Sequence, residues 1–208
     1  GMDTAGKGGI VRHVIGSVDP QGVQLRAFKA PTAEERAEHF LDRIRRGLPS
    51  PGMIGVFDRS HYEDVLIGRV RSLAPPEEID ARYDEIVRFE EEVVARGTTI
   101  VKLMLHISRD EQKKRLQERL DRPDKHWKFN PGDIDERALW PQYQDAYERA
   151  ILRTSTDTAP WHVVPADRKW FARLTAQRLL LRALREIDPQ WPAADFDVEA
   201  EKVRLAAT

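Results

Sequence analysis

The first nine residues of the chain have the pattern of a phosphate-binding loop. Gly1 is followed by four residues, then by Gly6 and Lys7, which gives the pattern G-x-x-x-x-G-K. Glycines let a backbone turn tightly, so its N–H groups, the lysine and the positive end of a following helix (residues 7–16) could hold phosphate. An unliganded glycine-rich linker is the alternative interpretation. The residues concerned are Gly1, Gly6, Lys7, Gly8 and Gly9.

Two aspartates are candidates for holding a divalent metal ion. Loops of this kind usually supply a Ser or Thr hydroxyl to Mg²⁺, but here that position is Gly8. Asp3 could replace the hydroxyl, because a carboxylate beside a phosphate site needs a cation between them. Asp58 ends the apolar run 53–57, as does the metal-binding aspartate of many nucleotide-binding strands, and Arg59 after it could contact phosphate. The alternatives are a turn cap for Asp3 and a plain strand end for Asp58.

The segment 113–128 is basic in a chain that is otherwise close to neutral. It has seven basic and three acidic residues, whereas the whole chain has 34 Lys and Arg against 35 Asp and Glu. Arg115, Arg119 and Arg122 are spaced to share one face of a helix. Guanidinium groups bind phosphate in a bidentate manner and stay charged, so such a face suits a chain of phosphates. A solvated face with ion pairs between turns is the alternative.

Strands and helices alternate along the chain, which predicts an α/β fold with a mostly parallel sheet. Ligands of such sheets bind beyond the carboxyl ends of the strands, where the loop and Asp58 would meet. A phosphate loop usually follows a buried strand, and this sequence has none before Gly1, so we expect an empty central position in the sheet unless the sequence begins after that strand. We expect strands at 22–29, 53–57, 99–107 and 161–164, and helices at 32–46, 76–96, 109–120, 135–153 and 170–187.

Composition excludes several classes of protein. The 208 residues suit one domain, and the absence of Cys excludes disulfide scaffolds, zinc-thiolate sites and thiol nucleophiles. A net charge of −1 gives no general attraction to nucleic acid or membranes, and no apolar run is long enough for a membrane span. We therefore expect a cytoplasmic protein without nucleic-acid or membrane partners, with a domain over 1–187 and a tail over 188–208.

Four segments, in order, resemble polyphosphate kinase family 2 over residues 1 to about 187. They are residues 1–9, Phe57-Asp58-Arg59-Ser60-His61-Tyr62-Glu63-Asp64, residues 113–129 with Trp127-Lys128-Phe129, and 154–161 with 165–167. The resemblance implies a P-loop kinase fold, a three-layer α/β/α sandwich with a helical lid at about 109–137. It also implies Mg²⁺- or Mn²⁺-dependent phosphoryl transfer between inorganic polyphosphate and a nucleotide, in a homo-oligomer (dimer or tetramer).

The resemblance assigns expected roles by position. The paired metal-binding aspartates correspond to Asp3 and Asp58, the catalytic loop lysine to Lys7, and the catalytic arginine after the second aspartate to Arg59. The basic residues of the lid correspond to Arg115, Arg119, Arg122, Lys125 and Lys128, and a Lys-x-Pro-Thr stretch near the nucleotide contains Lys29 and Thr32.

The segment 60–64 is more similar to members that phosphorylate AMP, some of which also take ADP, than to members specialised for diphosphates. We expect His61 to be a scaffold residue, because a phosphate oxygen with a second pKa of about 6 needs no strong base to act as nucleophile. Two other functions fit the loop and the aspartates. One is an ATP-dependent P-loop kinase acting on a nucleoside, nucleotide or small metabolite; the other is a non-catalytic module that binds polyphosphate or nucleotide.

Overall fold

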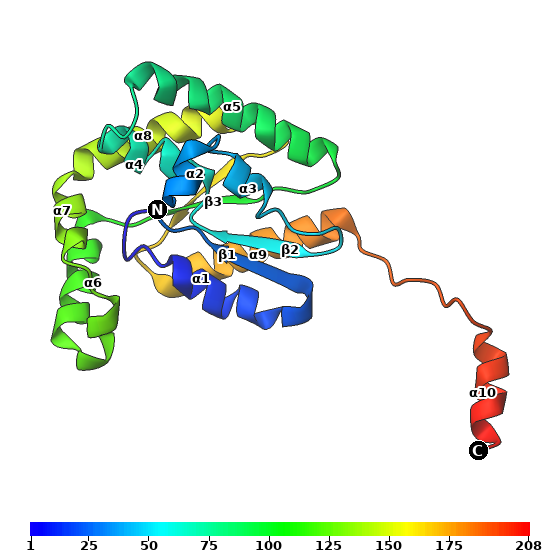
Figure 1. Cartoon of the computed structure of the whole chain (residues 1–208). Helices are drawn as coiled ribbons and strands as arrows, with labels where there is room; N and C mark the ends of the chain where they lie inside the picture. The colour runs from blue at the N-terminus through cyan, green and yellow to red at the C-terminus, as the bar shows by residue number, and fades with distance from the viewer.

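The structure is a computed structural model that describes residues 1–208. Its strands form two parallel pairs, β1 with β2 and β3 with β4, and helices lie on both sides of them (Figure 1). This confirms the predicted α/β class with parallel strands. No ladder hydrogen bonds join β2 to β3, so the strands make two small sheets rather than one. The strands are β1 (Val23–Ala27), β2 (Ile54–Asp58), β3 (Lys102–His106) and β4 (Trp161–Pro165).

The chain has ten α-helices, and all but α10 belong to the body or the lid. The long helices α5 and α8 pack against each other, and α1 packs on α9, which in turn contacts β4. None of the helices is both long and apolar enough to cross a membrane. The helices are α1 (Lys7–His13), α2 (Ala33–Ala37), α3 (Asp42–Arg45), α4 (Ile67–Val70), α5 (Pro76–Ala95), α6 (Arg109–Asp121), α7 (Gly132–Ala138), α8 (Trp140–Thr154), α9 (Lys169–Ile187) and α10 (Val198–Ala206).

Two predicted helices are each divided in the structure. The helix expected at 32–46 becomes α2 and α3, because the backbone is extended at Glu38 (φ −95°, ψ 171°). Thr32 begins α2 with a capping box: its hydroxyl accepts from the Glu35 N–H at 3.2 Å, and the Glu35 carboxylate accepts from the Thr32 N–H at 3.0 Å. The helix expected at 135–153 breaks at Leu139, where Pro141 is suited to the first turn of a new helix.

A buried polar network joins β3 to the helices above it. The Lys102 ammonium donates to the Glu90 carboxylate (2.5 Å), the Thr154 carbonyl (2.7 Å) and the Tyr62 hydroxyl (3.1 Å). His61 lies in the same network, 3.4 Å from Glu90 and only 7% exposed, as its interpretation as a scaffold residue predicts. Tyr62 comes four residues after Asp58, the last residue of β2. The network therefore fixes the backbone segment that follows Asp58.

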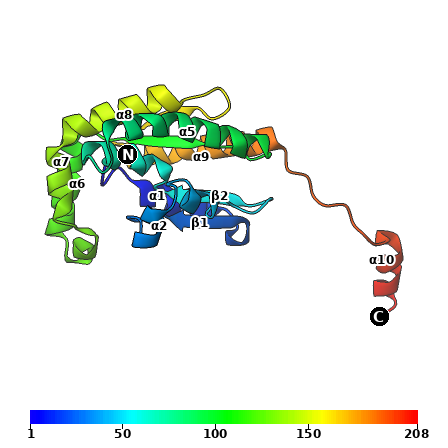
Figure 2. The same cartoon turned by 45° about the horizontal axis from the view of Figure 1, so that its top comes forward.

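Two parts of the chain extend from the body. The lid, formed by α6, the 3₁₀ turn η4 (Pro123–Lys128) and α7, projects at one side of the strands (Figures 1 and 2). The tail leaves α9 at Asp188, which has a left-handed backbone (φ 48°), and runs outward to α10. The sequence analysis did not predict α10, although its N-cap is well formed: the Asp197 carboxylate accepts from the next N–H groups, those of Glu199 and Ala200, at 3.0 Å each.

Candidate active site

The glycine-rich segment forms a tight loop in front of α1. Gly6 has a φ of 116°, which glycine adopts most easily, and α1 begins at the next residue. The Lys7 ammonium reaches back to the carbonyl oxygens of Gly1 (2.8 Å) and Met2 (3.4 Å), so the lysine lies across the loop. Thr4 also has a positive φ, 64°, a conformation that is uncommon for non-glycine residues and that is enriched at active sites and ligand clamps. The segment therefore has the geometry of a loop shaped around a ligand.

Arg115 clamps this loop from the side of the lid. Its guanidinium, in a residue that is 5% exposed, donates to the loop carbonyls of Thr4 (2.9 Å) and Ala5 (3.3 Å). It also donates to the carbonyls of Ala166 (2.7 Å) and Asp167 (2.8 Å), just after β4. One buried side chain from α6 thus ties the loop to the end of a strand.

Gln112, one turn earlier on α6, adds to this clamp by donating to the carbonyl of Asp3 at 3.2 Å. The C=O and N–H of a trans peptide point in opposite directions. Since the carbonyls of residues 3–5 point to α6, the N–H groups of the peptides that contain them point away from it. Of these N–H groups, that of Ala5 is bonded to the Met2 carbonyl at 3.2 Å, whereas those of Thr4 and Gly6 have no acceptor. The two free donors are what the loop offers to an anion.

A cavity of about 230 Å³ lies between the loop, the end of β2 and the lid. Its lining includes the loop residues Gly1 and Met2, with the cations Lys7 and Arg59. The lid contributes Asn130 and Gly132, and α8 contributes two tyrosines, Tyr143 and Tyr147. Four carboxylates face the same space: Asp3, Glu63, Asp133 and Glu136.

Arg59 reaches the cavity through a strained backbone. It is the first residue after β2 and has a φ of 65°, a left-handed conformation that costs a non-glycine residue about 1–2 kcal/mol. Its guanidinium lies 3.6 Å from the Asp3 carboxylate. The turn thus brings a cation from the strand end to the loop, and contact of Arg59 with phosphate stays a prediction.

Three of the four cavity carboxylates have partners. Asp3 pairs with Arg59, Asp133 with Arg119 at 3.1 Å, and Glu136 with Arg71 at 2.8 Å. Glu63 makes no side-chain hydrogen bond or ion pair. The sequence analysis noted Glu63 within a family segment without giving it a role. Its position at the start of the 3₁₀ turn after β2 makes it available to a ligand or cation.

The oxygen donors of the cavity fit a divalent cation. Burial raises the pKa of Asp133 above its usual value, and the negative charge of Asp3 raises it further. Asp3 and Asp133 line the same cavity, and a cation between phosphates and these carboxylates would offset their negative charge. No three His, Asp or Glu side chains form a complete metal site. Mg²⁺ commonly takes only one or two carboxylates and completes its shell with phosphates and water.

The structure brings together part of the predicted site. Gly1, Asp3, Lys7 and Arg59 all line the cavity, whereas Asp58 ends β2 outside its lining, with a carboxylate that has no partner. Gly8 and Gly9 lie in the first turn of α1. The two residues predicted near the nucleotide lie elsewhere as well: Thr32 caps α2, and the Lys29 carbonyl accepts from Arg43 at 3.1 Å.

The predicted row of three arginines on one helical face is wrong, because only Arg115 and Arg119 lie within α6. Arg115 is buried against carbonyls, and Arg119 donates to Asp133 and to the Lys128 carbonyl (3.0 Å). Arg122 lies just beyond the end of α6, because it precedes Pro123 and the helical conformation is disfavoured for a residue before proline. Its guanidinium pairs with the Asp124 carboxylate at 2.8 Å. The three arginines therefore do not share a face.

The two lysines expected behind that row lie in η4, outside the cavity. The Lys125 ammonium is 3.7 Å from the Asp124 carboxylate, and the Lys128 ammonium lies 4.7 Å from the ring centroid of Trp127. Trp127 is 77% exposed, so this cation–π contact is at the surface of the lid. Both ammonium groups are accessible to a polyanion that approaches the lid.

The sequence analysis missed the contributions of Asn130, Asp133, Glu136 and the two tyrosines. Tyr143 and Tyr147 are both buried and also border the cavity. Asn130 and Asp133 belong to the sequence Asn-Pro-Gly-Asp, which predicts a turn. The sequence does not indicate which part of the fold this turn approaches.

A parallel α/β body, a glycine-rich loop with its lysine, and an arginine delivered from the next strand end define a P-loop phosphotransferase. The family model described as Polyphosphate kinase 2 (PPK2) matches residues 1–192. The chain belongs to this family.

Relatives and a solved structure agree with this assignment. The chain is 46% identical over 191 residues to AMP/ADP-polyphosphate phosphotransferase of Meiothermus ruber, covering 92% of this chain and 72% of that protein. It is 43% identical over 203 residues to ADP-polyphosphate phosphotransferase of Rhodopseudomonas palustris, covering 92% and 70%. The crystal structure of polyphosphate kinase 2 from Arthrobacter aurescens TC1 is 59% identical, with a TM-score of 0.97, covering 100% of this chain and 73% of that one.

Proposed function

We propose that this protein transfers a phosphoryl group between inorganic polyphosphate and a nucleotide, with AMP and ADP as acceptors. The observation that carries the proposal is the cavity in which Lys7, Arg59 and Asp3 meet beside the loop, in a chain of the PPK2 family. The relatives named above are polyphosphate phosphotransferases that use AMP or ADP. These names favour this function over an ATP-dependent kinase and over a module that only binds.

In the proposed reaction an oxygen of the acceptor phosphate attacks the terminal phosphorus of polyphosphate in line with the bond that breaks. The acceptor oxygen is largely ionised at neutral pH, so the chain supplies position and positive charge rather than a base. Lys7 neutralises the group in transfer, the loop N–H groups hold its oxygens, and Arg59 contacts the neighbouring phosphate. Arg115 acts indirectly, by holding the loop carbonyls away from the anion.

Asp3 and Asp58 are the residues that we propose to hold Mg²⁺ or Mn²⁺, which would neutralise charge between the phosphates. The two carboxylates come from different segments, the loop and the end of β2. Four basic residues of the lid remain our candidates for the polyphosphate chain, and Lys29 and Thr32 for the nucleotide. The lid candidates are Arg119, Arg122, Lys125 and Lys128.

The acceptors are tested by chromatography of nucleotides after incubation with polyphosphate. AMP, ADP and GDP are run in parallel with Mg²⁺, and each is repeated with EDTA. We expect ADP from AMP and ATP from ADP, both abolished by EDTA. If no acceptor gives product, the proposed function is wrong; if only GDP does, the acceptor assignment is wrong.

Replacing either proposed metal ligand is expected to change the dependence on metal. For Asp3→Asn and for Asp58→Asn, the Mg²⁺ concentration for half-maximal activity should rise about tenfold or more, because each change removes one of the few charged ligands. A tenfold rise corresponds to a loss of about 1.4 kcal/mol in the free energy of Mg²⁺ binding. Initial rates over a Mg²⁺ titration measure this shift. Asp135→Asn on the lid is the control. An unchanged Mg²⁺ dependence in Asp58→Asn would remove this residue from the metal site.

Binding of polyphosphate should weaken as salt is added. Exposed cations are screened within about 10 Å at 0.1 M salt and within about 3 Å at 1 M, so the lid cations lose much of their attraction for the chain. We expect the KM for polyphosphate to rise about tenfold between about 0.05 and 0.5 M KCl, with a smaller change in kcat. A KM that is independent of salt would mean that the lid cations do not bind polyphosphate.

A further inference from the structure

The last 21 residues, 188–208, form an arm that makes no contact of its own with the body. Every residue from Arg185 to Thr208 is exposed. The side-chain hydrogen bonds and ion pairs of the arm all join residues within it, such as Lys202 with Glu199 and Arg204 with Glu201. Figures 1 and 2 both show the arm running outward from the end of α9 to α10.

An arm of this composition needs a surface to pack on. Helix α10 has nine residues, and an isolated helix shorter than about 12–15 residues is marginal in water. The arm also exposes several large apolar side chains, with Trp191 at 96%, Leu205 at 75%, Val203 at 73% and Phe196 at 59%. Burying them would supply the free energy that the helix lacks by itself.

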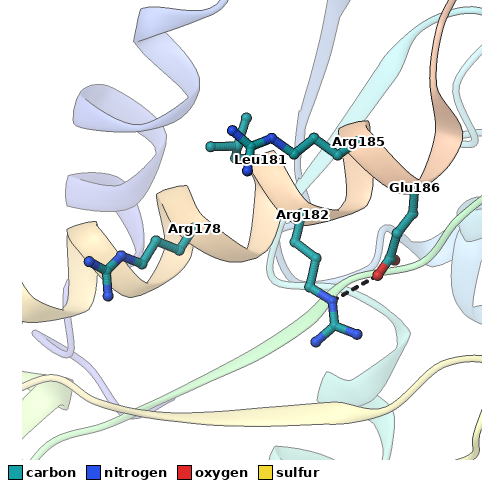
Figure 3. A pocket seen from close by; sticks show the side chains of 5 residues that line it. All are labelled: Arg178, Leu181, Arg182, Arg185 and Glu186. Atoms are coloured by element: carbon teal, nitrogen blue, oxygen red, sulfur yellow. Dashed lines mark hydrogen bonds and ion pairs between the residues drawn. The ribbon is translucent and has the colours of Figure 1, made fainter.

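A shallow hollow of complementary charge lies along the exposed surface of α9; all the residues that border its space of about 470 Å³ belong to this one helix. Figure 3 shows its lining: Arg178, Leu181, Arg182, Arg185 and Glu186. Arg182 donates to Glu186 at 2.7 Å, but Arg178 and Arg185 have no hydrogen-bond acceptor or ion-pair partner. Leu181, 45% exposed, gives the hollow an apolar side. Figure 3 shows the Arg185 side chain beside Leu181 and the Arg178 side chain pointing away from both. Two unpaired guanidinium groups and a leucine on one helix suit an acidic segment that also carries apolar residues.

The arm is such a segment. Helix α9 has five basic residues and one acidic residue, whereas the arm has five acidic residues and two basic ones. Two α9 helices would therefore repel each other, and an arm and an α9 helix would attract. Within the arm, Asp195, Glu199 and Glu201 lie close to the apolar residues Phe196 and Leu205.

We propose that the arm of one copy of this chain docks in the α9 hollow of a second copy, which returns its own arm in exchange. The reciprocal contact is closed and two-fold symmetric, so it gives a dimer and not a filament. A second copy fits better than the same chain, because the hollow lies in the last turns of the helix from which the arm starts. A fold-back would have to reverse within 188–197, where Pro189 and Pro192 favour an extended backbone.

Charge reversal tests the proposal by sedimentation velocity on the whole chain. We expect a dimer for the unchanged protein, and a dissociation constant at least about tenfold higher for Arg178→Glu/Arg185→Glu and for Asp195→Lys/Glu201→Lys. The combination of all four changes should restore the dimer. Arg88→Glu, on the exposed side of α5, is the matched control. Circular dichroism checks that each variant is folded.

Cross-linking separates exchange from fold-back, because the chain has no Cys. Leu181→Cys and Leu205→Cys are made in separate chains, mixed, and treated with a short bis-maleimide. A covalent heterodimer is the expected product. Cross-linking only within a chain that carries both cysteines, or a monomeric unchanged protein, would overturn the proposal. A dimer that survives both charge reversals would also overturn the proposal. If Arg178→Glu/Arg185→Glu then weakened the binding of polyphosphate, the hollow would be a polyanion site instead.

Discussion

Lys7→Ala is expected to lower kcat by about 10²–10³-fold or more and to leave the fold intact. Removal of one group that stabilises charge in a transition state typically costs this much. The lysine is placed for that role, because its ammonium already lies across the loop and lines the cavity. Its only partners are the carbonyls of Gly1 and Met2, so little of the fold depends on it. Initial rates at saturating substrates measure the effect.

The matched control is Arg12→Ala, which removes an exposed cation from the same helix, α1. This variant should keep its kcat within about twofold. Circular dichroism and urea denaturation check that both variants are folded. A kcat near that of the unchanged protein in folded Lys7→Ala would show that the loop lysine does not act on the transferred phosphate.

The second large effect is on stability. Arg115→Ala should lower the free energy of unfolding by about 3–5 kcal/mol, the usual cost of removing one partner from a buried charged interaction. The change leaves four backbone carbonyls and the Glu111 carboxylate, 2.8 Å from the arginine, without their donor. Since two of these carbonyls belong to the loop, the KM for polyphosphate should rise as well. Urea denaturation and steady-state kinetics measure the two effects.

Arg122→Ala is the control for this prediction. It removes an arginine from the same segment, but that side chain is exposed and paired at the surface, where ion pairs contribute about 0–1 kcal/mol. Arg115→Lys should be intermediate, because an ammonium keeps the charge but cannot reach all the acceptors. If Arg115→Ala kept its stability and lost kcat as Lys7→Ala does, Arg115 would contact substrate, as the sequence first suggested.

The fold was predictable wherever a local signal decided it. The parallel α/β class follows from the alternation of apolar runs and helical segments, and Thr32 and Ser108 cap α2 and α6 as their positions predict. The loop, Asp3 and Arg59 were found because a short pattern specifies them. Helix breaks at Glu38 and Leu139 were missed, since apolar periodicity continues across both and the packing of each half decides the break.

The lid could not be predicted at this level, because the same charge serves different partners. A guanidinium can donate to a carbonyl, a carboxylate or a phosphate, and only the fold places Arg115 beside the carbonyls of Thr4 and Ala5. Likewise, Glu63 and Asp133 are 70 positions apart in the sequence and meet only when the lid approaches the loop. Spacing on one helix cannot show such contacts.

The most direct test of the account is to identify the phosphate donor. The protein is incubated with AMP, Mg²⁺ and polyphosphate labelled with ³²P, with no nucleoside triphosphate present, and nucleotides are separated by chromatography. The account predicts labelled ADP, which requires Mg²⁺ and is lost in Lys7→Ala. If no labelled ADP appeared, but unlabelled ADP formed once ATP was supplied, the protein would be a kinase that uses ATP. That result would contradict the account.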